Sequence, residues 1–103
     1  MKKSILLLFI ACLPFLAKAE KVEIDGIWYN LTEKIREAEV TYGVSAGGYR
    51  GSITIPTTVE YNNTIYKVTS IGDEAFWDCI NLTSITLPNS VKKIKEEAFA
   101  NCI

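Results

Sequence analysis

The sequence of 103 residues contains no histidine and only three cysteines. Histidine is the commonest general base and the commonest metal ligand, so its absence removes the usual centre of acid–base and metal chemistry. Two of the cysteines, Cys79 and Cys102, are too few ligands for a metal site by themselves. No phosphate-binding loop is present, and the serines and threonines have no partner base. We therefore expect no enzymatic activity, no catalytic residue, no metal, no cofactor and no small-molecule substrate.

Basic residues are scarce in the part of the chain that would fold. The sequence has 11 basic and 12 acidic side chains, and Lys2, Lys3 and Lys18 all lie near its N-terminus. Removal of the segment 1–19 would leave a chain with 8 basic and 12 acidic side chains, a net charge of −4. An acidic chain without a basic stripe argues against nucleic acid and anionic membranes as partners. The remaining length suits one small domain.

The sequence has no apolar run long enough to cross a membrane. The apolar run at the N-terminus spans residues 5–17, thirteen residues, whereas a spanning helix needs about 20. It follows two lysines and precedes Ala17-Lys18-Ala19, which together form the three-part pattern of a secretory signal. We expect a signal peptide at residues 1–19, cleaved after Ala19, and a secreted or cell-surface protein. The alternative is that the segment stays attached as a membrane anchor.

Cys12 leaves a second interpretation of the same segment open. Residues 10–12 (IAC) loosely resemble a lipoprotein signal, in which the cysteine would be acylated and would attach the chain to a membrane. Phe9 fits that pattern poorly, and apolar rather than polar residues follow the cysteine. Apart from that uncleaved anchor, a lipid anchor at Cys12 is the only membrane contact that we keep as an alternative to cleavage after Ala19.

An internal repeat is the main signal in the rest of the chain. Residues 68–80 (VTSIGDEAFWDCI) and 91–103 (VKKIKEEAFANCI) are identical at seven of thirteen positions, at an offset of 23. All the matches except one glutamate are apolar or thiol side chains, which are the kinds that fill a core. The predicted repeat core consists of Val68, Ile71, Ala75, Phe76, Cys79, Leu82, Ile85, Leu87, Val91, Ile94, Ala98, Phe99 and Cys102.

A second internal match lies earlier in the chain. Residues 52–59 (SITIPTTV) and 84–91 (SITLPNSV) are identical at five of eight positions, at an offset of 32. The nine extra residues correspond to 60–68, where strand-favouring residues flank Asn62-Asn63, a pair that tolerates positive φ. The pattern predicts an inserted β-hairpin at residues 60–68, with a simple loop as the alternative.

One repeat unit can be described from its residue pattern. Residues 73–78 are predicted to form a short helical turn whose apolar side chains face inward. Residues 82–87 are predicted to form a strand that ends at Pro88, because proline cannot donate a hydrogen bond to a strand ladder. A unit this small cannot bury its own apolar face, so successive units must stack with their strands about 4.8 Å apart.

The spacing Leu82-x-x-Ile85-x-Leu87, with Ala-Phe-x-x-Cys before it and Leu-Pro-x-Ser-Val after it, resembles the bacterial surface leucine-rich repeats of the BspA or Treponema type. The resemblance covers residues 52–103. It implies an α/β repeat solenoid with short strands and short helical turns, preceded by a β-hairpin-rich N-terminal cap at residues 20–51. It also implies an adhesion-type module that binds host or cell-surface proteins.

The predicted contact surface is the polar side of the strands. Because residues alternate in a strand, the serines and threonines between the apolar positions face outward. Trp77 is placed at one edge of this surface, because the equivalent position in the next repeat is Ala100 and a core position would be less free to change. The residues predicted for the binding face are Ser52, Thr54, Ser84, Thr86 and Trp77.

The remaining aromatic residues have two interpretations. They form a binding patch for sugar or peptide, or they fill the cap and the core, which is the commoner role of such side chains. Glycines at 47, 48 and 51 predict a loop around Tyr49. The aromatic side chains concerned are Trp28, Tyr29, Tyr49, Tyr66 and Trp77.

The paired cysteines and the acidic residues of the two turns also allow more than one role. Cys79 and Cys102 occupy the same slot one repeat apart, within the range of a disulfide, but stacked slots point side chains in parallel and so favour two buried thiols. The acidic residues would either bind Ca²⁺ weakly or satisfy free N–H groups at the start of each turn, and we expect the second. These acidic residues are Asp73, Glu74, Asp78, Glu96 and Glu97.

The chain departs from the family in its number of repeats. It ends at Ile103, within its second full unit, whereas a solenoid needs about three or more repeats and a polar terminal cap. We expect the C-terminal end to be uncapped. The chain would then be a truncated N-terminal remnant of a longer leucine-rich-repeat surface protein without independent function, or it would need a partner over that end, self-association included.

Overall fold

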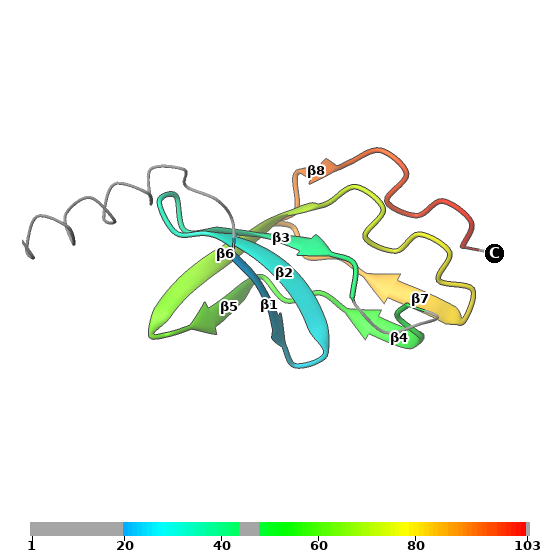
Figure 1. Cartoon of the computed structure of the whole chain (residues 1–103), viewed down its shortest axis with the longest axis horizontal. Helices are drawn as coiled ribbons and strands as arrows, with labels where there is room; N and C mark the ends of the chain where they lie inside the picture. The colour runs from blue at the N-terminus through cyan, green and yellow to red at the C-terminus, as the bar shows by residue number, and fades with distance from the viewer. Residues whose placement is uncertain (1–19, 44–47, 103) are drawn as a thin grey trace, which may run out of the picture.

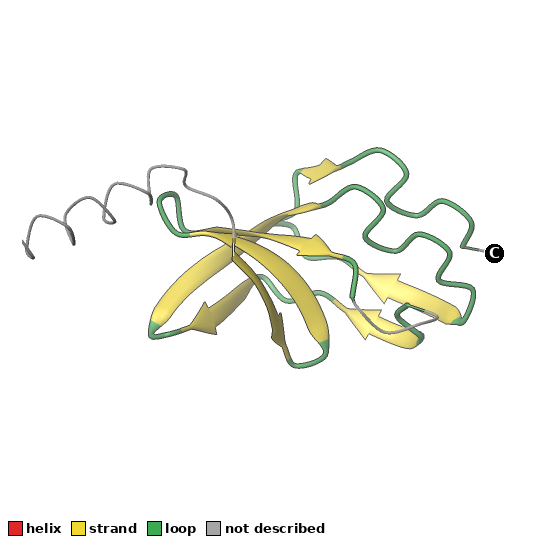
Figure 2. Ribbon diagram, in the orientation of Figure 1, coloured by secondary structure: helices red, strands yellow, loops and turns green. Residues whose placement is uncertain are grey.

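The computed structural model describes residues 20–43 and 48–102, so the predicted signal peptide and Cys12 lie outside the described residues. This part of the chain contains eight β-strands and no helix (Figure 2). Six strands form one sheet and the other two form a second sheet. The described residues accordingly include no helix of the length and apolarity that crossing a membrane requires.

The N-terminal cap is an antiparallel meander of β1 (Glu20–Ile24), β2 (Ile27–Thr32) and β3 (Glu37–Thr41). The turn between β1 and β2 consists of Asp25 and Gly26, with φ angles of 51° and 86°, as a two-residue hairpin turn requires. Buried residues alternate with partly exposed ones along β2 and most of β3, and Val22 is the buried residue of β1, so the cap presents one apolar face to the core. The buried cap residues are Val22, Ile27, Tyr29, Leu31, Ala38 and Val40.

A hairpin of β5 (Thr58–Tyr61) and β6 (Thr64–Ile71) extends the same sheet. The hairpin turns at Asn62 and Asn63, whose φ angles of 52° and 64° fit the tolerance of asparagine for the left-handed region. Strand β6 also pairs in parallel with β3, which gives the order β1-β2-β3-β6-β5. The hairpin insertion therefore connects the cap to the repeats through one shared strand.

Each repeat unit forms one coil of the chain, and the two 23-residue units begin at residues 68 and 91. The repeats contribute strands to two sides of these coils. On one side, β4 (Gly51–Thr54) and β7 (Leu82–Thr86) form a parallel two-stranded sheet. On the other side, β8 (Lys93–Ile94) pairs in parallel with β6 and so joins the cap sheet. Figure 1 shows β4 and β7 together below the coil and β8 above it.

The strand registers reproduce the two internal offsets of the sequence. Ser52 pairs with Ser84, at the offset of 32, and Ile71 pairs with Ile94, at the offset of 23. The extra nine residues of the first offset are accommodated in the β5–β6 hairpin. Both offsets therefore bring equivalent positions of successive coils next to each other.

The predicted helical turn at residues 73–78 is wrong, because this segment is a series of β-turns. Glu74 and Asp78 have φ angles of 58° and 60°, and the equivalent Glu97 and Asn101 have 57° and 62°. A left-handed residue at every fourth position interrupts a right-handed helix before one can form. The α/β description of the solenoid is therefore replaced by strands joined through turns.

The turns of the two coils hydrogen bond to each other. The Phe76 N–H donates to the carbonyl oxygen of Ala98 at 2.7 Å, and the Asp78 N–H donates to that of Ala100 at 2.8 Å. These bonds satisfy backbone groups that a helix would have satisfied internally. The two segments consequently run alongside each other as matching loops (Figure 2).

Three aromatic rings stack through the centre of the coils. The rings of Phe76 and Phe99 are 5.1 Å apart with an interplanar angle of 9°. On the other side of Phe76, the ring of Tyr49 lies 4.8 Å away with an angle of 40°. The segment between β3 and β4 therefore supplies an aromatic ring that packs against the phenylalanines of the repeats.

Burial of the predicted repeat core decreases toward the last coil. Ile71 is fully buried, whereas its register partner Ile94 is 52% exposed, so the prediction of Ile94 as a core residue is wrong. Ile94 lies at the edge of the sheet, where no described strand covers it. The buried members of the predicted core are Val68, Ile71, Ala75, Phe76, Cys79 and Ala98. Leu82, Ile85, Leu87, Val91, Phe99 and Cys102 are partly buried against them.

Candidate functional site

The polar residues predicted for the binding face lie together on β4 and β7. Ser52 is paired with Ser84, and Thr54 with Thr86, and all four side chains are exposed. The Ser52 and Ser84 hydroxyls form a hydrogen bond of 2.8 Å. We call these four residues the strand face. Their role in binding stays a prediction.

Trp77, the fifth predicted residue, lies on the turns and lines a separate pocket. Its side chain is 47% exposed, and the pocket has a volume of about 330 Å³. None of the four strand-face residues lines this pocket. Tyr42 also lines it and is 52% exposed, and the charged residues of the described lining are Glu74 and Asp78. We call this space the tryptophan pocket.

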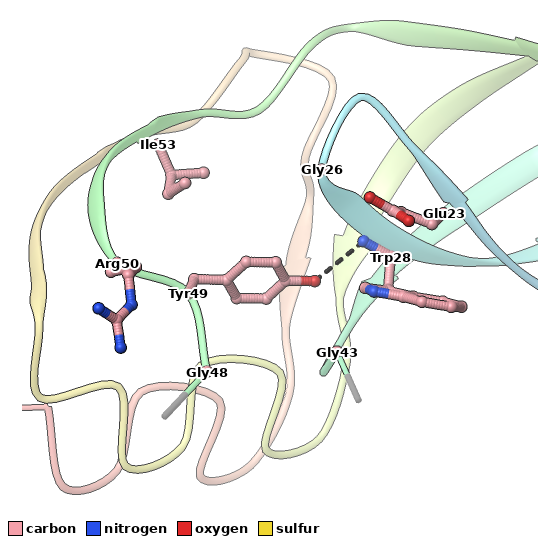
Figure 3. Close-up of a pocket in the computed structure, with 8 residues that line it drawn as sticks. All are labelled: Glu23, Gly26, Trp28, Gly43, Gly48, Tyr49, Arg50 and Ile53. Atoms are coloured by element: carbon pink, nitrogen blue, oxygen red, sulfur yellow. Dashed lines mark hydrogen bonds between the residues drawn. The ribbon is translucent and has the colours of Figure 1, made fainter. Parts of the chain in front are cut away.

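A second pocket of about 340 Å³ lies between the cap and the first coil (Figure 3). Trp28 and Glu23 line it from the cap, and Tyr49 and Arg50 line it from the segment before β4. Figure 3 shows the Tyr49 ring crossing toward Trp28, with the Arg50 guanidinium directed away from Glu23. The two pockets share Gly43 and Gly48 in their linings.

The hydroxyl group of Tyr49 is held on both sides by backbone. It donates to the carbonyl oxygen of Thr41 at 2.6 Å and accepts from the Trp28 N–H at 2.9 Å. Burial raises the pKa of Tyr49 to about 12, although the bond from Trp28 acts in the opposite direction. The hydroxyl therefore stays protonated at neutral pH and cannot serve as a base or a nucleophile. Its role is to fasten the cap to the coil.

Both described cysteines are free thiols. Cys79 is buried, and burial raises the pKa of its thiol above the usual range. The Cys102 thiol donates to the carbonyl oxygen of Phe76 at 2.7 Å. Both features favour a structural role over a reactive one.

The acidic residues of the turns do not converge. All five are exposed, and three of them, Glu74, Asp78 and Glu97, have positive φ angles, which excludes the predicted role at the start of a helical turn. In residues 20–43 and 48–102, no group of three or more potential metal-ligating side chains is placed to hold an ion. These residues therefore serve mainly as solvated turn positions, apart from the two that line the tryptophan pocket.

A polar network that sequence reasoning missed connects the cap to the second coil. The Lys95 ammonium group forms an ion pair with the Glu39 carboxylate at 3.0 Å, and the Ser70 hydroxyl donates to the same carboxylate at 3.2 Å. Nearby, the Thr69 hydroxyl donates to the Glu37 carboxylate at 3.2 Å. These partners are far apart in the chain, by 31 to 56 positions. The parallel pairing of β3 with β6 brings Thr69 and Ser70 to the two glutamates, and the pairing of β6 with β8 brings Lys95 beside them.

Tyr42 was the pocket residue that sequence analysis did not identify. It lies beyond the end of β3, just before Gly43, and its exposure follows from that position. The usable signal was an aromatic residue directly before a glycine-rich segment, because such segments lie on the surface next to binding pockets more often than strands do. The alternation of apolar and polar residues within β3 did not indicate that Tyr42 would line a pocket.

Coils stacked at a regular offset, each adding a short strand to a parallel ladder and sharing one interior, define a leucine-rich-repeat protein. Residues 52–103 match the family model described as the BspA type leucine rich repeat region (6 copies). The chain belongs to this BspA-type leucine-rich repeat family, which confirms the resemblance seen in its motifs. No curated protein matches the chain.

Solved structures with the same fold come from bacterial proteins. A leucine-rich repeat protein from Bacteroides ovatus is 36% identical with a TM-score of 0.68, over 79% of this chain and 21% of that one. A leucine rich cell surface protein from Faecalibacterium prausnitzii is 30% identical with a TM-score of 0.65, over 81% and 21%. The pneumococcal vaccine antigen PcpA is 26% identical with a TM-score of 0.56, over 80% and 24%. The chain thus spans about a fifth of the first two proteins.

Proposed function

We propose that this chain is a non-catalytic module that binds protein through the strand face, outside the cell or at its surface. The partner would be a host protein or a protein of a neighbouring cell. The expected signal peptide directs the chain out of the cytoplasm. The absence of histidine from the whole sequence supports a binding role over a catalytic one.

The observation that carries this proposal is the in-register arrangement of the strand face. Two pairs of short polar side chains lie on adjacent parallel strands, exposed to solvent and tied by the bond between Ser52 and Ser84. Solenoids use such regular faces as extended binding surfaces. A similar protein is described as a cell surface protein and another as a vaccine antigen, which supports an exposed location.

The test is a binding screen of the mature chain against an array of extracellular-matrix and bacterial surface proteins. Thr86→Arg places a long charged side chain on the strand face, at the end of β7, and should abolish binding to any true partner. Thr58→Arg is the matched control, because Thr58 is also an exposed strand threonine but belongs to β5 in the cap sheet. Partners that tolerate Thr86→Arg, or that lose binding equally with Thr58→Arg, would contradict the proposal.

A second candidate function is that of an opening segment, with the cap and first coils serving as the base for further repeats. This chain covers only 21% of each of the first two similar solved chains, which favours this candidate. Sequencing of the DNA downstream of the Ile103 codon tests it. Further repeat units at the same offset, in frame or after a frameshift, would support it, and an intergenic region would contradict it.

A further inference from the structure

The tryptophan pocket has the composition of a site for a cationic side chain. Two half-exposed aromatic rings, Trp77 and Tyr42, line it, together with the carboxylates of Glu74 and Asp78. Both charges are negative, and no basic residue of the described segments 20–43 and 48–102 lines the pocket. Aromatic faces and carboxylates together attract a cation that keeps part of its surface apolar.

Comparison of the two coils distinguishes the residues that the turn requires for folding from those that only the pocket uses. Four residues of the first turn recur unchanged in the second: Glu74, Ala75, Phe76 and Cys79 recur as Glu97, Ala98, Phe99 and Cys102. Three residues differ: Asp73 is replaced by the equally charged Glu96, and the two that line the pocket, Trp77 and Asp78, are replaced by Ala100 and Asn101. Because the second turn keeps the same backbone without the aromatic ring or the second charge, neither is required for folding.

The left-handed backbone at position 78 explains why aspartate or asparagine stands there, but it does not explain the negative charge of Asp78. Asp78 and Asn101 have φ angles of 60° and 62°, and both residue types tolerate that region. Asparagine would therefore satisfy the backbone at position 78 as it does at 101. The carboxylate of Asp78 adds a negative charge beside Trp77 that the local conformation does not demand.

The wall of the pocket is held in place by backbone hydrogen bonds. The Trp77 N–H donates to the carbonyl oxygen of Glu74 at 3.1 Å, and the Asp78 N–H donates to that of Ala100 at 2.8 Å. The turn thus joins the aromatic ring and both carboxylates to one short, fixed segment. A site with fixed groups loses less conformational entropy when it binds than a flexible loop does.

One ring of the pocket already accepts a cation within the molecule. The ammonium group of Lys21 lies 3.9 Å from the centroid of the Tyr42 ring and 5.6 Å from that of Trp28. This geometry is within the range of a cation–π contact. Lys21 therefore occupies one face of Tyr42, and Trp77 is the aromatic ring of the pocket on which a ligand cation would stack.

We propose that the tryptophan pocket binds an arginine side chain of a protein partner. The planar guanidinium group would stack on Trp77 and be paired by Glu74 and Asp78, which suits arginine better than the more strongly hydrated lysine. This inference rests on the proposed function only in taking the partner to be a protein. It concerns a different surface, since no strand-face residue lines the pocket.

The test is an NMR titration of the ¹⁵N-labelled mature chain with N-acetyl-arginine amide. The indole N–H resonance of Trp77, assigned by its loss in Trp77→Ala, should shift in a saturable way. N-acetyl-citrulline amide, which has nearly the same shape without the charge, should give little shift. Equal shifts with both compounds would overturn the proposal, and stronger shifts with N-acetyl-lysine amide would overturn the choice of arginine.

Glu74→Gln and Glu97→Gln form a matched pair of variants. Both residues are exposed, both have positive φ angles, and both occupy the same slot of their coil, but only Glu74 lines the pocket. Glu74→Gln and Asp78→Asn should each weaken arginine binding about two- to fivefold, as expected for the loss of one exposed charge contact. Glu97→Gln should leave it unchanged, and an equal effect of Glu97→Gln would contradict the site.

These outcomes are distinguishable from those of the protein screen. The arginine titration needs no natural partner, so it can succeed where the screen finds none. Conversely, a partner that is lost with Thr86→Arg and kept with Trp77→Ala would support the strand face and place the pocket outside that interface. A partner lost with either variant would show that both surfaces contribute to one interface.

Discussion

The ring of Tyr49 lies 4.8 Å from the ring of Phe76, which also contacts the ring of Phe99 in the next coil at 5.1 Å. The sequence around Tyr49 does not match the repeat, yet its side chain continues the stack that Phe76 and Phe99 form in the repeats. Its hydroxyl is bonded to the backbone of two cap strands, at Trp28 and Thr41. Tyr49 thus joins the interior of the cap to that of the coils.

Substitution of Tyr49 should separate the role of its ring from that of its hydroxyl. Tyr49→Phe keeps the stack and leaves the Trp28 N–H and the Thr41 carbonyl without their partner, which should cost about 1–3 kcal/mol of unfolding free energy. Tyr49→Ala also removes the ring and should cost about 3–5 kcal/mol. Urea unfolding of the mature chain measures both. A Tyr49→Phe variant as stable as the parent would show that the two hydrogen bonds contribute nothing.

Stability should fall at alkaline pH because Tyr49 is held in its neutral form. Burial raises its pKa from 10 to about 12, so the folded state keeps a proton that the unfolded state loses. The contribution of this group is complete below pH 10 and is lost between pH 10 and 12, at about 1.4 kcal/mol per pH unit. Burial also raises the pKa of Tyr29, which adds to the decline.

Urea midpoints measured from pH 8 to 12 test this dependence on Tyr49. The Tyr49→Phe variant, less stable at pH 8, should lose stability more gradually above pH 10 than the parent chain does. Tyr42→Phe is the control, because it removes the hydroxyl of an exposed tyrosine instead of a buried one. Parallel curves for the parent and Tyr49→Phe would contradict a buried, neutral Tyr49.

The repeats were predictable from the sequence because equivalent positions recur at fixed offsets. The pairing of Ser52 with Ser84 follows from an identity visible in the chain, and the turn at Asn62-Asn63 follows from the tolerance of asparagine for positive φ. The strand face could therefore be placed on one surface before the structure was known. The binding role of the strand face could not be predicted in the same way, because short polar residues serve equally well as solvated strand positions.

The errors arose where the outcome depends on contacts distant in sequence. The Ala-Phe pair in each turn suits a helix locally, but the turn adopts a left-handed conformation at Glu74 and hydrogen bonds to the next coil instead. Ile94 matches Ile71 in sequence, yet its burial depends on a neighbour beyond β8. The role of Tyr49 could not be predicted, because Tyr49 lies outside the repeat pattern and that pattern does not show where the cap ends.

The two described cysteines should react as unpaired thiols, one buried and one partly buried. Thiol titration of the unfolded, unreduced mature chain should count two, because both are free in the structure. In the folded chain Cys79 should be labelled by iodoacetamide more slowly than Cys102, since its thiol is buried and its pKa is raised by that burial. Mass spectrometry of the labelled peptides measures both rates. Fewer than two thiols would indicate a disulfide between the coils.

Gly72 should be intolerant of substitution because the first coil approaches the cap closely there. A β-carbon at Gly72 would contact the Glu39 carboxylate and would lie 3.0 Å from the Val40 carbonyl oxygen, to which the Gly72 N–H donates at 2.8 Å. Gly72→Ala should therefore cost about 1–3 kcal/mol of unfolding free energy through overpacking.

The equivalent position in the next coil provides the control for this prediction. Lys95 stands there, and Lys95→Ala removes only a partly exposed ion pair with Glu39, which is worth about 1 kcal/mol or less. If the Glu39 carboxylate is the main obstacle at Gly72, Glu39→Ala should recover part of the loss in a double-mutant cycle. A cost for Gly72→Ala no greater than that of Lys95→Ala would show that the cap can shift away from the coil.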